Sequence, residues 1–171
     1  MFRDRADAGR RLGVRLRDVL EDPVVLGLPR GGVIVAAEVA ALLAAPLDIV
    51  VARKLGVPWQ PELAFGAVAP GVVVLQEDVL DAIGLGRGEI DAAVARESAL
   101  LGSLGERYRG TAPAVPLSDR MVIIVDDGLA TGATATAAVR SVRMSAPRSV
   151  HVAVPVAAAR TAAMLRAEVD A

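Results

Sequence analysis

The feature that most constrains this chain is a short apolar run that ends in two acids and a glycine. Residues 121–125 read Met-Val-Ile-Ile-Val, and Asp126, Asp127 and Gly128 follow directly. So short and largely β-branched a run is typical of a buried parallel strand rather than of a helix. We therefore predict a core strand whose carboxyl end carries a functional site.

The loop after the two acids has residue types that suit an anion. Gly128 and Gly132 permit a close approach of the backbone, and Thr131 and Thr134 supply hydroxyls where a helix is expected to begin. The free N–H groups of that first turn favour a phosphate, and the helix dipole alone contributes roughly 0.3–1 kcal/mol. The predicted phosphate loop consists of Gly128, Leu129, Ala130, Thr131, Gly132, Ala133 and Thr134.

The sequence of this loop excludes two common kinds of phosphate site. A Walker A loop ends in Gly-Lys-Ser/Thr, whereas residues 131–134 read Thr-Gly-Ala-Thr and contain no lysine. A dinucleotide loop requires G-x-G-x-x-G and lacks the pair of acids at the strand end. The ligand should therefore join a phosphate to vicinal hydroxyls, as ribose 5-phosphate does.

Residues 125–134, Val-Asp-Asp-Gly-Leu-Ala-Thr-Gly-Ala-Thr, resemble the signature with which type I phosphoribosyltransferases bind 5-phosphoribosyl 1-pyrophosphate (PRPP). The resemblance implies that Asp126 and Asp127 accept hydrogen bonds from the ribose hydroxyls and that the loop holds the 5-phosphate. It also implies transfer of the 5-phosphoribosyl group from PRPP to a nitrogenous, nucleobase-like acceptor, with release of pyrophosphate. Ala130 stands where hypoxanthine-guanine enzymes carry an acid, so the acceptor stays unassigned.

A second glycine loop lies upstream, again between a predicted strand and a predicted helix. Residues 24–28 are predicted to form a core strand and residues 33–45 an apolar helix, with Pro29-Arg30-Gly31-Gly32 between them. Such a junction can bind an anion through its N–H groups and Arg30, or it can be a tight turn alone. In the resembling family a short loop at this position holds pyrophosphate, which makes Arg30, Gly31 and Gly32 candidate substrate-binding residues.

A pair of basic residues follows the next apolar run. Residues 47–52 are predicted to form the second core strand, which stops at Arg53 and Lys54. Because the carboxyl ends of parallel strands line the ligand crevice, both side chains should point towards the polyphosphate. Lys54 is the only lysine of the chain, and an exposed basic pair is the alternative. With the resemblance, we assign Asp126, Asp127, Arg53 and Lys54 to catalysis.

A proline-punctuated segment then precedes a predicted hairpin. Residues 65–69 and 72–75 flank Pro70-Gly71, and we expect a lid or hairpin insertion at about 56–76. Closure of a lid would exclude water from a reactive sugar cation, although a structural loop is also compatible with this sequence. Glu62, within the segment, is the best candidate for a general acid or base.

The remaining elements alternate between helices and strands. The pattern predicts a single domain over 1–171 with a three-layer α/β fold, a mostly parallel, doubly wound sheet and a small hood or lid. The resembling family usually continues with a further strand and a tail, so we expect a sequence cut short or a small sheet edge. The other predicted elements are helices at 2–20, 76–84, 87–108 and 157–169 and a strand at 149–154.

Composition narrows the partners and the setting. The net charge is −1, so no global field attracts nucleic acid or a membrane, and there are no cysteines for disulfides or a thiolate site. The start of the chain has no apolar signal core, and we predict a soluble, cytoplasmic homo-oligomer. His151, in the middle of a predicted strand, is expected to be structural rather than catalytic.

The resemblance also implies Mg²⁺ as a cofactor. A hard cation would bind the pyrophosphate and ribose oxygens, so we predict no metal ligand from the protein. Two alternatives stay open at this point. One is a non-catalytic regulatory protein that binds PRPP, and the other is a binder of a different sugar phosphate or nucleotide.

Overall fold

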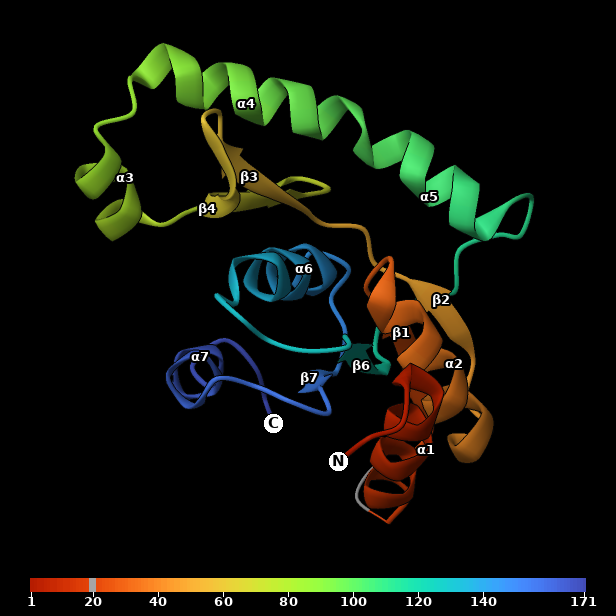
Figure 1. Cartoon of the computed structure of the whole chain (residues 1–171). Helices are drawn as coiled ribbons and strands as arrows, with labels where there is room; N and C mark the ends of the chain where they lie inside the picture. Colours follow the sequence, from red (N-terminus) through yellow and green to blue (C-terminus); the bar gives the residue numbers. More distant parts are fainter. Residues whose placement is uncertain (19–20) are drawn as a thin grey trace.

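A four-stranded parallel sheet forms the centre of the molecule. The computed structural model describes residues 1–18 and 21–171, apart from the side chains of residues 61 and 62. The strands lie in the order β2-β1-β6-β7, so the chain starts near the middle of the sheet and extends it in both directions (Figure 1). Their bounds are Pro23–Gly27 for β1, Leu47–Ile49 for β2, Met121–Val125 for β6 and Ser149–Ala153 for β7.

Helices cover both faces of this sheet. Successive side chains of a strand point to opposite faces, so Val122 and Ile124 pack against α6 (Ala133–Arg143). Ile123 and Val125 point the other way, towards α2 (Gly31–Leu43), on which α1 (Arg5–Leu16) packs. The predicted three-layer α/β fold is confirmed, and the central run is buried because both faces are covered.

A second, antiparallel sheet lies on the α6 side. It contains β3 (Arg53–Val57), β4 (Gln60–Ala69) and β5 (Val72–Leu75), and the predicted hairpin around Pro70 and Gly71 is confirmed as β4 and β5. The Ser141 hydroxyl of α6 donates a hydrogen bond of 2.8 Å to the Pro70 carbonyl oxygen, which joins the hairpin to the core. The division into one domain with a lid at 56–76 stays a prediction.

The helices that follow the hairpin form an arm over the second sheet. Figure 1 shows α4 and α5 as an almost continuous rod above β3 and β4. Phe65 and Val68 of β4 are fully buried there, with Leu80 and Ala93 from the helices packed against them. The bounds are Glu77–Ile83 for α3, Arg87–Ala99 for α4, Leu101–Arg109 for α5 and, after β7, Ala159–Leu165 for α7.

Three predicted boundaries need correction. The second core strand ends at Ile49 because its partner β1 ends at Gly27, which is paired with Ile49. The apolar residues 50–52 are a buried connection to the second sheet, not part of the strand. The single helix predicted at 87–108 is interrupted at Leu100, and the N-terminal helix ends at Leu16, while the last two residues of its predicted range lie outside the described residues.

Candidate functional site

The two glycine loops leave the same edge of the parallel sheet, side by side. Gly27 at the end of β1 is paired with Val125 at the end of β6, and the Leu28 N–H donates to the Val125 carbonyl oxygen at 2.9 Å. The first loop enters α2 and the second enters α6, and neither helix has a side-chain hydrogen bond at its N-cap. The peptide bond between Pro29 and Arg30 is cis. Two helix N-termini therefore point at one edge, where an anion is favoured.

Two glycines allow the first loop to contact the two acids. A Cβ atom at Gly32 would lie 2.6 Å from the Val125 carbonyl oxygen and 2.8 Å from the Asp126 Cα atom. A Cβ atom at Gly31 would overlap the Asp127 carboxylate. Glycine at these two positions thus allows the upstream loop to lie directly against the acids.

The Asp126 carboxyl group has an unusual protonation equilibrium. Burial raises its pKa from 3.8 to about 6. The Asp127 N–H donates to Asp126 Oδ1 at 2.8 Å and opposes this shift, whereas the negative charge of the Asp127 side chain adds to it. The site therefore holds two adjacent carboxyl groups, and that of Asp126 is costly to ionise.

This shift predicts that Asp126→Asn stabilises the protein above pH 6. Below pH 3.8 Asp126 is protonated in both the folded and the unfolded chain; between 3.8 and 6 only the folded chain keeps the proton, so stability falls as pH rises. The whole shift corresponds to about 3 kcal/mol, and partial exposure reduces it, so we expect a gain of about 1–2 kcal/mol at pH 8. Urea unfolding of both proteins at pH 4 and pH 8 measures it. A gain that is the same at both pH values would contradict the shift.

The segment after β7 supports the phosphate loop. The Leu129 N–H donates to the Val156 carbonyl oxygen at 3.0 Å, and the Thr161 hydroxyl donates to the Ala130 carbonyl oxygen at 2.5 Å. Leu129 and Ala133 are buried, whereas Ala130 and Thr131 are exposed. Gly132 has φ +82°, in the left-handed region that favours glycine. Burial of two side chains thus fixes the loop while its centre stays open to solvent.

The structure separates the two basic residues predicted at the strand end. Arg53 and Lys54 are the first residues of β3, where successive side chains point to opposite faces. Arg53 lines a cavity of about 310 Å³ with Arg30, and its Nε atom is 2.6 Å from Glu97 Oε2. Lys54 does not line this cavity. The prediction that both side chains leave the end of a parallel strand together is wrong.

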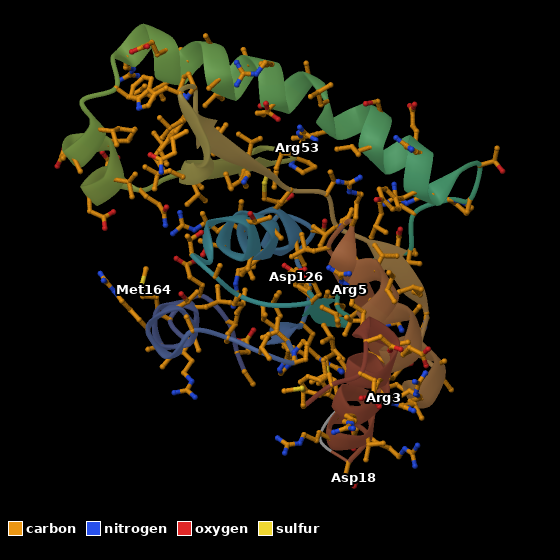
Figure 2. The ribbon with its side chains drawn as sticks, in the orientation of Figure 1. Arg3, Arg5, Asp18, Arg53, Asp126 and Met164 are labelled. Carbon is orange, nitrogen blue, oxygen red and sulfur yellow. The ribbon has the colours of Figure 1, made fainter. Side chains whose placement is uncertain are left out.

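Other functional candidates come from segments that the sequence does not connect with the site. Arg107 and Tyr108 of α5 line the same cavity as Arg30. Arg5 of α1 donates from Nε to Asp127 Oδ2 at 2.6 Å, and Figure 2 shows Arg5 close to Asp126, with Arg53 on the strand above. No local pattern marks these residues, because the contact between Arg5 and Asp127 joins positions 122 residues apart.

The remaining sequence predictions concern Glu62, His151, a metal ion and a membrane span. Glu62, the acid or base candidate, has a side chain outside the described residues. His151 lies in mid-strand with Nε2 3.1 Å from the Ser149 hydroxyl, and burial lowers its pKa. In the described part of the chain, no three Asp, Glu or His side chains gather to hold a metal ion, and no helix is both long and apolar enough to cross a membrane.

Comparison with known proteins places the chain among relatives. No protein-family model matches it. The crystal structure of TT1426 from Thermus thermophilus is 45% identical, with a TM-score of 0.76, over 97% of this chain and 80% of that chain. The chain belongs to the family of TT1426.

One further relative carries a provisional name, and one solved structure shares the fold. Rv0571c of Mycobacterium tuberculosis, which is named provisionally as a phosphoribosyl transferase, is 50% identical over 158 residues, or 91% of this chain. The chain spans only 36% of that relative. A hypoxanthine phosphoribosyltransferase from Staphylococcus aureus is 11% identical over 92% of this chain and 65% of that chain, with a TM-score of 0.54. This chain therefore has the same fold as that phosphoribosyltransferase structure.

Proposed function

We propose that this chain is a phosphoribosyltransferase that moves the 5-phosphoribosyl group of PRPP to a nitrogenous, nucleobase-like acceptor and releases pyrophosphate. One observation carries the proposal: two helix N-termini meet at one sheet edge, with Asp126 and Asp127 between them. PRPP has the matching chemistry, because its ribose ring carries a phosphate at one end and a pyrophosphate at the other. The name of Rv0571c supports the same activity.

The two acids and the downstream loop would bind the ribose 5-phosphate half. Asp126 and Asp127 accept hydrogen bonds from the 2- and 3-hydroxyls, and binding favours the ionised form of Asp126. The loop 128–134 receives the 5-phosphate through the N–H groups of the α6 first turn and the hydroxyls of Thr131 and Thr134. The exposure of Ala130 and Thr131 supports this role, because a phosphate can reach the backbone there.

The upstream loop would bind the pyrophosphate half. Gly31 and Gly32 form the first turn of α2, which has no side-chain cap, and Arg30 and Arg53 supply positive charge around one cavity. Lys54 stays a sequence prediction without a place in this cavity. Mg²⁺ fits a site that offers two carboxylates at the ribose, and its main ligands would be substrate oxygens. When bound, it would supply charge neutralisation to the leaving pyrophosphate.

Catalysis in this arrangement depends on holding the ring and stabilising charge. The C1 atom of the ribose gains positive charge as its bond to pyrophosphate lengthens. The bond pair leaves with the pyrophosphate, and the acceptor nitrogen forms the new bond to C1. Asp126 and Asp127 favour the cationic ring electrostatically, and the 29–32 loop favours the departing anion. The acceptor is not assigned by these residues.

Calorimetry with PRPP, with and without Mg²⁺, tests the proposal. We expect saturable binding that Mg²⁺ strengthens, with a dissociation constant between about 1 µM and 1 mM. Pyrophosphate release is then assayed with purine, pyrimidine and nicotinate-like bases. Binding without release for any base would favour the non-catalytic regulatory protein, and absence of PRPP binding would overturn the assignment of the site.

A further inference from the structure

We propose that Arg5, the first residue of α1, is a positioning residue of the PRPP site. It would hold Asp127 against the upstream loop and supply positive charge where the acids meet the pyrophosphate. This inference rests on the proposed function. Its first support is the short contact from Arg5 Nε to Asp127 Oδ2, at 2.6 Å.

The Arg5 guanidinium lies between Asp127 and the upstream loop. A Cβ atom built on Gly31 would overlap Asp127 Oδ2 and lie 3.0 Å from Arg5 Nε. The ion pair therefore sits directly on the backbone of the 29–32 loop. A guanidinium has five N–H donors, and the bond to Asp127 uses only Nε, so donors of the two Nη groups remain for a ligand at the 29–32 loop.

Close packing of α1 on α2 determines where Arg5 lies. A Cβ atom at Gly9 would be 2.7 Å from the Val35 carbonyl oxygen, and one at Gly13 would be 2.8 Å from Leu42 Cδ1. Only glycine allows the two helices to approach so closely there. Asp4 caps the start of α1 by accepting from the Asp7 N–H at 2.7 Å, so Arg5 begins a well-formed helix at a fixed distance from the site.

Fold stability does not explain the ion pair. The Arg5 side chain is 58% exposed and that of Asp127 is 32% exposed, and ion pairs in such surroundings contribute little to stability. Arg5 and Asp127 instead line one cavity of about 240 Å³, together with Pro155 and Val156 after β7. A pair that borders a cavity can contact a ligand.

The ion pair of Arg5 and Asp127 also changes the charge of the proposed site. The carboxylates of Asp126 and Asp127 repel the negative charge of a nearby pyrophosphate, and this repulsion opposes the binding of PRPP. Arg5 offsets one carboxylate and leaves Asp127 Oδ1 able to accept a ribose hydroxyl. Arg53 is paired with an acid outside the pair of site carboxylates, Glu97 at 2.6 Å, whereas the acid that Arg5 offsets is Asp127 itself.

The test compares Arg5→Ala, Arg5→Lys and the control Arg10→Ala by calorimetry with PRPP and with pyrophosphate alone. Arg10 lies on the same helix and pairs with Glu38 at 3.0 Å, so its loss removes a similar surface ion pair away from the site. We expect Arg5→Ala to weaken PRPP and pyrophosphate binding about tenfold, which is the effect of roughly one charge-assisted hydrogen bond. Arg5→Lys should recover part of this loss, and all variants should melt within a few degrees of the wild type.

The outcomes separate the two proposals. If the wild type binds PRPP and Arg5→Ala binds as tightly as Arg10→Ala, the role of Arg5 is overturned while the proposed function stands. If Arg5→Lys is as weak as Arg5→Ala for both ligands, the positive charge is not what matters and the role is overturned again. If the wild type binds no PRPP, both proposals fail together.

Discussion

Changing Asp126 and Asp127 together to asparagine should remove PRPP binding almost completely. Each carboxylate would lose a charge-assisted hydrogen bond to a ribose hydroxyl, worth roughly 1.5–3 kcal/mol. One such loss weakens binding about tenfold or more, so the double variant should bind at least about a hundredfold more weakly. Calorimetry with PRPP and Mg²⁺ measures the change. Asparagine keeps the shape of each side chain, and the Asp126→Asn change should not destabilise the fold.

Glu21 and Asp22 provide a matched control for this variant. They are also adjacent acids and are exposed, but they precede β1 at Pro23, the end of that strand opposite Gly27 and the site. The variant Glu21→Gln with Asp22→Asn makes the same change in net charge and should bind PRPP within about twofold of the wild type, because exposed charges are screened by salt. Equal losses in both double variants would show a general effect of charge and contradict a specific site at Asp126 and Asp127.

The central part of the site could be predicted from sequence because local rules determine it. The apolar run 121–125 has no polar residue that tolerates exposure, so it must be covered on both faces. Parallel strands place their carboxyl ends at one edge, which brings the 29–32 loop and Asp126 together once both strands are recognised. These features depend on residues within a few positions of each other and on one general property of parallel sheets.

The basic residues could not be predicted because tertiary pairing decides their position. Apart from Asp48 the run 47–52 is apolar, yet pairing stops at Ile49, and nothing after Asp48 marks where the strand becomes a buried connection. Arg53 therefore begins a strand in another sheet and faces Glu97 of α4. Arg5 lies on a helix whose charges are typical of a solvated surface, and only the folded chain shows its contact with Asp127.

Gly32→Ala should both destabilise the protein and disrupt the site. Its new Cβ atom would lie 2.6 Å from the Val125 carbonyl oxygen and 2.8 Å from the Asp126 Cα atom. Both neighbours are backbone at the end of a central strand, so neither can rotate away as a side chain could. Overpacking of this kind costs about 1–3 kcal/mol, and the required shift would move Asp126 from its position beside the loop. Urea unfolding and PRPP calorimetry should therefore both report a loss.

Gly88→Ala is the control, because it makes the same substitution at a position where the new Cβ atom causes no clash. Gly88 lies in α4, and a Cβ atom there would meet nothing within 4 Å. Alanine is the better helix former, so this variant should gain up to about 1 kcal/mol and bind PRPP like the wild type. If Gly32→Ala were as stable as Gly88→Ala and kept its affinity, the 29–32 loop would not lie against the acids as closely as these distances require. Loss of affinity with unchanged stability would instead indicate that the loop gives way and Asp126 alone is displaced.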